Sequence, residues 1–215
     1  MFKALMTVQW KWSKGAALLA TICGFAIPMA SVQTSMPEYM GPGSVVARMQ
    51  EFGIAYALLA AGVGLAFALL AWSSDHKGRH VYALSLPIDR SRYAAMRFAA
   101  GALFLLLPAL GVLLGCLLAI ALMHVPAGLH AYPLSLALRF LLASAVSFSI
   151  FFAVAASTPK AAGMILGGFA SILVVAFVLS LTSIQFDLLG YSRDFLFTEP
   201  GPLSVFTGRW MLIDA

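Results

Sequence analysis

The chain has 215 residues, of which 62% are hydrophobic and only 10% are charged. Soluble domains are about half apolar and about a quarter charged, so this composition excludes a soluble globular protein and predicts an integral membrane protein. Basic residues in so apolar a chain usually orient membrane helices, so the net charge of +5 predicts no nucleic-acid partner.

The first segment, residues 1–14, carries five residues at helical spacing, while lysines occupy other faces: Phe2, Leu5, Met6, Gln9 and Trp10. This pattern predicts an amphipathic helix that lies in the cytosolic membrane interface. The alternative is the basic first region of a signal peptide. Two apolar segments follow, residues 15–32 and 50–72, and each has the roughly 20 residues that a membrane-spanning helix needs.

A basic loop, residues 73–97, separates the second and third apolar segments. It contains five of the thirteen lysines and arginines, namely Lys77, Arg79, Arg90, Arg92 and Arg97. A basic loop in this position is predicted to face the cytoplasm. Inside it, a patch from Val81 to Ile88 is apolar but too short to span a bilayer, so it is interpreted as a docking surface.

The third, fourth and fifth predicted spans cover residues 98–123, 134–156 and 161–184. Pro108 predicts a kink in the third span, and Gly111 and Gly115 are spaced for close packing of two helices. The fold class is therefore an all-α membrane protein with about five transmembrane helices preceded by an interfacial helix.

The final segment, residues 185–215, is too polar to cross a membrane and carries scattered aromatic side chains, which predicts a tail at the outer interface. A cytosolic N-terminus places nine basic residues inside and four outside, and five spans then leave the C-terminus extracytoplasmic. We expect the protein in a bacterial plasma (inner) membrane.

Several residue patterns that carry out transport or catalysis are missing from the sequence. There is no charge in the middle of a predicted span, which argues against an ion-coupled carrier, and there is no protease or Walker A motif. His76 and His80 are four residues apart but lack a third ligand, so no metal site is predicted. No catalytic residue or cofactor is expected, and any ATP hydrolysis would reside in a partner subunit.

The basic loop resembles the cytosolic loop of type-2 ABC exporter permeases. The similarity is carried by an acidic residue and a glycine, Asp75 and Gly78, followed by the segment from Tyr82 to Tyr93 that contains Pro87-Ile88. Asp75 and Arg79 stand where the family more often has Glu and Thr. The family has six spans and a cytosolic C-terminus, so this chain is expected to lack the sixth span.

The resemblance implies that residues 15–184 form a permease-like domain and that the basic loop contains a coupling helix. This helix would sit in a groove of an ATP-binding cassette ATPase subunit, and a second permease chain would complete a homo- or heterodimer. The implied contact residues are Asp75, Lys77, Arg79, Tyr82, Leu84, Leu86, Pro87, Arg90 and Arg92, with a secondary inner contact at Pro159 and Lys160. Alternatively, the arginines only hold orientation and bind anionic lipid headgroups.

The leading hypothesis is thus the membrane-spanning permease subunit of an ATP-driven exporter. The alternative is a non-transporting structural or scaffold subunit of a larger membrane complex. The two hypotheses differ in whether the basic loop binds a nucleotide-hydrolysing partner.

Overall fold

The computed structural model describes most of the chain and divides it into two compact units. One unit is Met1–Phe152 with Arg209–Ala215, and the other is Ala153–Gly208. The described residues are 2–35, 42–77, 89–122, 129–157, 164, 167, 168, 171, 175, 194–198, 201–208 and 210–214.

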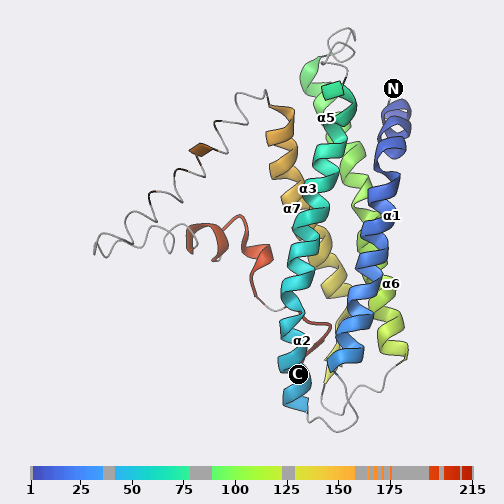
Figure 1. The fold of residues 1–215 in the computed structure, drawn as a ribbon, viewed down its shortest axis with the longest axis vertical. Helices are drawn as coiled ribbons and strands as arrows, with labels where there is room; N and C mark the ends of the chain where they lie inside the picture. The colour runs from blue at the N-terminus through green and yellow to red at the C-terminus, as the bar shows by residue number, and fades with distance from the viewer. Residues whose placement is uncertain are drawn as a thin grey trace. The chain divides into compact units, whose positions relative to one another are not determined.

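Long helices dominate the described residues (Figure 1). They are α1 (Phe2–Ser35), α2 (Pro42–Glu51), α3 (Gly53–Lys77), α5 (Arg90–Phe104), α6 (Leu106–Ala121) and α7 (Pro133–Ala156). A 3₁₀ helix, η1 (Ser204–Phe206), and two short strands, β1 (His130–Ala131) and β2 (Ile213–Asp214), complete the set.

Four helical segments are long and apolar enough to cross a membrane, which confirms the first four predicted spans. They are Phe2–Val32, Met49–Ser73, Arg90–Ala121 and Pro133–Ala156. A helix of about 20 residues covers the roughly 30 Å of hydrocarbon in a bilayer, and all four exceed that length. The chain is therefore a membrane-embedded helical protein. Most of the predicted fifth span, residues 161–184, lies outside the described residues.

The separate amphipathic helix predicted for residues 1–14 is not supported, because α1 is one continuous helix from Phe2 to Ser35. The predicted face is the more buried side of this segment, since Gln9 is buried and Leu5 and Met6 are partly buried. Gln9 is 5% exposed and Ser13 is fully buried, whereas Trp10 remains 47% exposed. Neighbouring helices cover this side of α1, and Gln9 lies close to Gly101 of α5.

The third predicted span is interrupted at Leu105, which separates α5 from α6. Leu105 N–H donates to Ala102 O over 3.1 Å, a tighter turn than an α-helix makes. Pro108 lies three residues further on, where its ring lacks an N–H and crowds the carbonyl of Phe104. The proline thus explains the break, which falls in the turn before it.

The helices α1 and α6 lie side by side (Figure 1) and approach closely through glycine. A Cβ atom added at Gly111 would lie 2.6 Å from Thr21 O, and one added at Gly115 would collide with Phe25 O. Large leucines of α6, such as Leu110 and Leu114, are exposed instead. Since lipid is as apolar as leucine, small residues face the partner helix and large ones face the membrane. This confirms the predicted packing role of the glycine pair.

Replacing Gly115 with alanine is expected to destabilise the protein by about 1–3 kcal/mol, because the methyl group would force α1 and α6 apart. Gly62→Ala on α3 is the matched control, since its added Cβ would meet nothing within 4 Å. Denaturation in mixed micelles measures the free energy of unfolding of both variants. Equal stability of the two would contradict the close approach of α1 and α6.

The helices α3 and α7 also approach closely through a glycine. A Cβ at Gly64 would lie 2.6 Å from both Phe148 N and Ser144 O, so no larger residue fits. Ser147 Oγ donates a 2.8 Å hydrogen bond to Ala61 O across this contact. Within a membrane, such small and weakly polar residues bring two helix backbones together.

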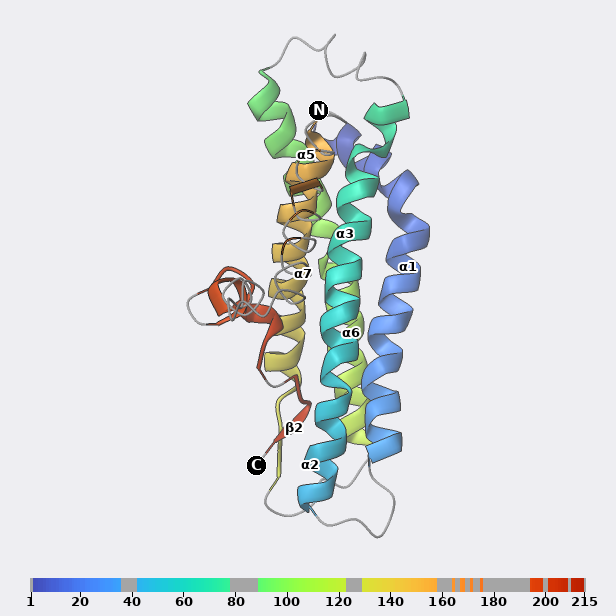
Figure 2. The same ribbon diagram turned by 60° about the vertical axis from the view of Figure 1, so that its left-hand side comes forward.

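A C-terminal segment, residues 210–214, packs at the end of the bundle that carries α2, opposite the end at which α3 stops and α5 begins (Figure 2). Its strand β2 pairs antiparallel with β1, with His130 opposite Asp214, and Tyr132 N–H donates to Leu212 O over 2.8 Å. Trp210 is 3% exposed, and the guanidinium of Arg139 lies 4.8 Å from the centre of its ring. We call these opposite ends the α2 end and the loop end.

In the second unit, residues 194–198 and 201–208 form a compact turn. Leu203 N–H donates to Leu196 O over 2.8 Å, and Thr207 Oγ1 donates to Phe197 O over 2.9 Å. Gly208 has a φ of 85°, a conformation that favours glycine.

Candidate functional site

The loop end of the bundle contains a cluster of buried polar and aromatic side chains, which we call the loop-base cluster. It consists of Ala71, Trp72 and Asp75 on α3 and Tyr93 and Arg97 on α5. Asp75 lies two residues before the end of α3, and Arg97 lies seven residues after the start of α5. The cluster therefore joins the two helices that flank the central part of the basic loop.

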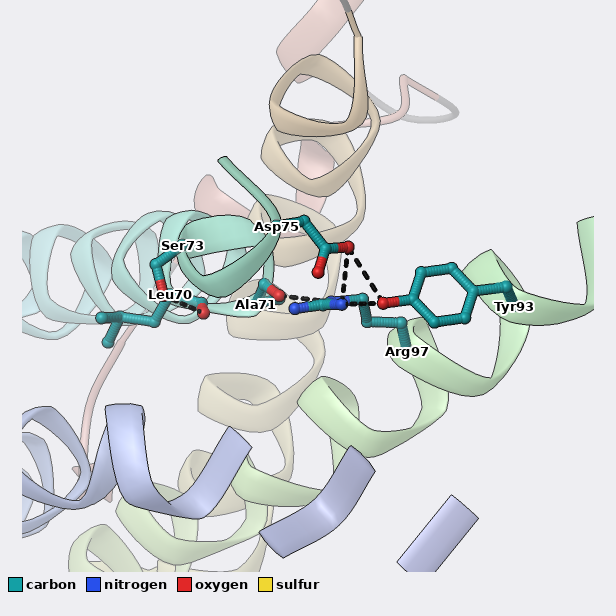
Figure 3. Close-up of polar contacts among 6 residues, drawn as sticks. All are labelled: Leu70, Ala71, Ser73, Asp75, Tyr93 and Arg97. Carbon is teal, nitrogen blue, oxygen red and sulfur yellow. Dashed lines mark hydrogen bonds and ion pairs between the residues drawn. The ribbon is translucent and has the colours of Figure 1, made fainter. Parts of the chain in front are cut away.

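An ion pair between Asp75 and Arg97 holds the cluster together (Figure 3). Arg97 Nη1 lies 2.7 Å from Asp75 Oδ2, and the two residues are only 4% and 5% exposed. The pair is a charge-assisted hydrogen bond in a site that excludes water, where each charge needs the other. It closes the basic loop at its base.

Arg97 also makes contacts that fix the plane of its guanidinium. Its Nε donates to Ala71 O at 2.5 Å, which ties it to the backbone of α3. The guanidinium carbon lies 5.2 Å from the ring centre of Trp72 and 5.5 Å from that of Tyr93. These are cation–π distances, so two aromatic rings take the place of water around the charge.

Tyr93 completes a closed set of hydrogen bonds. Its hydroxyl donates to Asp75 Oδ2 over 3.0 Å and accepts a hydrogen bond from Arg97 Nη1, as Figure 3 shows. Tyr93 and Arg97 are four residues apart and so lie on the same face of α5. These three hydrogen bonds therefore link a carboxylate on α3 to two side chains on α5, which stabilises the contact between these helices.

Aromatic side chains connect the loop-base cluster to the rest of the first unit. Trp72 and Phe152 have ring centres 5.2 Å apart, and Phe98 is the same distance from both Phe148 and Phe152. Such distances are typical of favourable aromatic pairs. Displacement of the loop base would therefore also move the aromatic side chains of α7.

The chemistry of the cluster suits a positioning role. It contains one carboxylate, one guanidinium and one phenol, and all three bond to one another. Within the part of the chain that the structure describes, no three His, Cys, Asp or Glu side chains gather as metal ligands would. The cluster can hold two helices and the loop between them in a fixed relation.

The contact residues predicted in the basic loop and at the secondary inner contact divide into three groups. Asp75 is buried within the loop-base cluster, so it can act on a partner only through the loop that it positions. Arg90 and Arg92 are exposed in the first turn of α5 and are accessible. The side chain of Lys77 is not described, and the remaining predicted contacts lie outside the described residues: Arg79, Tyr82, Leu84, Leu86, Pro87, Pro159 and Lys160.

Sequence reasoning missed the roles of Arg97 and Tyr93. Arg97 is one of the basic residues expected to orient the loop, but it is buried as the partner of Asp75. The available signal is the spacing of Tyr93 and Arg97, which places both on one helical face after an acidic residue that ends the preceding span.

Comparison with known proteins adds no relative: no protein-family model matches the chain, and no curated protein or solved structure is significantly similar to it. The four apolar helices and their glycine-mediated contacts identify the chain as a membrane-embedded helical protein whose loop end is closed by a buried ion pair.

Proposed function

We propose that this chain is the membrane-spanning permease subunit of an ATP-driven ABC-type exporter, coupled through its basic loop to a separate ATPase subunit. The observation that carries the proposal is the buried Asp75–Arg97 ion pair at the base of that loop. A loop that receives force from a partner must be attached firmly to the helices that it moves. The ion pair supplies this attachment to α3 and α5 together.

The exposed part of the loop supports the same proposal. Arg90 and Arg92 are exposed at the start of α5, while Arg97 on the same helix is withdrawn into the ion pair. Exposed arginines steer association with an acidic rim on a partner, and their effect falls as salt rises. The division between exposed and buried arginines separates a docking role from an attachment role.

A route for displacement leads from the loop into the membrane. Arg97 is on α5, which continues through Leu105 into α6, and α6 is in glycine-mediated contact with α1. Trp72 and the phenylalanines of α7 provide a second contact. A movement at the loop base is therefore passed to α1 and α7, which a permease needs in order to alternate between inward and outward states.

The proposal includes a second permease chain, a cytosolic N-terminus and a location in the bacterial inner membrane. Its test is purification of the full chain from its native membrane in mild detergent, with identification of co-purifying subunits by mass spectrometry and an ATPase assay. An ATP-binding cassette subunit is expected to co-purify and to hydrolyse ATP.

Arg90→Glu is expected to weaken this association at least about tenfold, since it places a negative charge against an acidic rim. Lys3→Glu is the matched control, because it makes the same charge change on an exposed residue outside the loop. Both variants should keep wild-type thermal stability. Recovery of a stable integral complex without any ATPase would reject the exporter and favour the scaffold subunit.

A further inference from the structure

The first turns of α1 carry a basic face that the exporter proposal does not use. Lys3, Lys11 and Lys14 are all exposed, and their spacings of eight and three residues place them on one side of a helix. Gln9 and Ser13 occupy the opposite, buried side. In the described part of the chain, none of these lysines forms an ion pair. Their positive charges are therefore available to an external partner.

Two tryptophans flank the lysines. Trp10 is 47% exposed and Trp12 is 39% exposed, although Trp10 also stacks on Phe104 with ring centres 5.6 Å apart. Half-exposed tryptophans are typical of the membrane–water interface, where the ring contacts both apolar and polar surroundings.

The position of these lysines and tryptophans along α1 gives their depth in the membrane. The apolar residues 15–32 rise by about 27 Å, which matches the hydrocarbon thickness, and Lys14 directly precedes them. Trp10 is then about 6 Å beyond the hydrocarbon edge, within the headgroup layer of about 5–7 Å, whereas Lys3 is about 16 Å beyond it. Lys11 thus lies within the headgroup layer, Lys14 lies at its hydrocarbon edge with a side chain long enough to reach the phosphates, and Lys3 lies beyond the layer.

We infer that Lys11 and Lys14, with Trp10 and Trp12 at the two edges of the exposed side of α1, form a binding site for the headgroups of anionic phospholipids. Exposed ammonium groups at phosphate depth attract anionic lipids, and the indole rings hold the helix at the interface. A soluble protein partner fits this face less well, because Lys14 and Trp12 lie at the edge of the hydrocarbon. The inference is independent of the exporter proposal.

Lipid retention on the purified full-length chain tests this inference. The protein is equilibrated with equimolar phosphatidylglycerol and phosphatidylcholine in detergent, and the lipids that remain bound are quantified by mass spectrometry. Phosphatidylglycerol should be enriched, and Lys11→Gln and Lys14→Gln should each lower the enrichment about fivefold, the effect of about 1 kcal/mol per basic residue. Raising the salt to 1 M should also lower it, since the Debye length falls to about 3 Å.

Two control variants make the outcome specific. Lys3→Gln carries the same charge change beyond the headgroup layer and should leave the enrichment unchanged, and so should Arg90→Gln in the basic loop. Unchanged enrichment in the Lys11→Gln, Lys14→Gln double variant would overturn the inference. An equal loss in Lys3→Gln or Arg90→Gln would also overturn it, because the lipid would then respond to overall charge or to the loop.

Discussion

Replacing Arg97 with alanine is expected to destabilise the protein by about 3–5 kcal/mol, the largest effect that we predict for a single substitution at the loop end. Asp75 is only 5% exposed, and without Arg97 its carboxylate would remain as an unpaired buried charge. The hydrogen bond to Ala71 O and the cation–π contact with Trp72 would be lost as well. Unfolding of the purified protein in mixed micelles measures the change.

Arg92→Ala is the matched control for Arg97→Ala, since it removes an exposed arginine from the same helix. It should change stability by no more than about 0.5 kcal/mol. A double-mutant cycle with Asp75→Ala should give a coupling energy of about 0.5–3 kcal/mol, because the two side chains are in direct contact. If Arg97→Ala and Arg92→Ala unfold alike, the buried ion pair does not hold the loop base.

Arg97→Ala also distinguishes attachment from docking. If the exporter proposal holds, the variant retains the exposed Arg90 and Arg92 and so still binds the ATPase subunit, but coupling of ATP hydrolysis to the bundle is lost. Binding and coupling measured on the same preparation separate these two effects. Loss of binding with coupling intact would contradict the assigned roles.

Replacing Trp210 with alanine is expected to destabilise the α2 end by about 3–5 kcal/mol, as other buried tryptophan truncations do. Its side chain is almost fully buried, and Gly53 packs against it so closely that an added Cβ would lie 3.3 Å from Trp210 Cβ. The half-buried guanidinium of Arg139 would also lose the ring that it covers. A lower apparent melting temperature of the purified protein is the readout.

Phe195→Ala serves as the control for Trp210→Ala, because Phe195 also belongs to the aromatic C-terminal region but is 76% exposed. It should leave the melting temperature unchanged. The conservative variant Trp210→Phe should keep part of the stability that Trp210→Ala loses, because a smaller aromatic ring still fills much of the site. Equal melting temperatures of the Trp210→Ala and Phe195→Ala variants would show that the C-terminal segment does not stabilise the bundle.

The first four spans could be predicted from sequence because each needs only a long apolar segment, a property of neighbouring residues. The glycine contact of α6 was also predictable, since Gly111 and Gly115 are one turn apart and share a face. The prediction of a separate interfacial helix is not supported, because residues 2–14 continue without a break into the first span. Neighbouring helices cover Gln9, which belongs to the predicted face, and Ser13 beside it.

The loop-base cluster could be predicted only in part. The sequence singles out Asp75, but its partner Arg97 is 22 residues away, and five basic residues of the loop are equally available to pair with it. Only the packing of α3 against α5 selects Arg97, because its position on α5 brings the guanidinium between Trp72 and Tyr93. Arg90 and Arg92, on the same helix, stay exposed.

Local sequence is enough to show that this is a membrane protein, where four of its helices lie, and that its basic residues concentrate in a loop and an N-terminal segment. These properties follow from the energy of transferring side chains into lipid, which depends on composition over short stretches. Packing between distant segments selects the arginine that is buried, covers one face of α1 and brings residues 210–214 back to pair with β1. Those outcomes depend on contacts between residues far apart in the chain, which a local pattern does not contain.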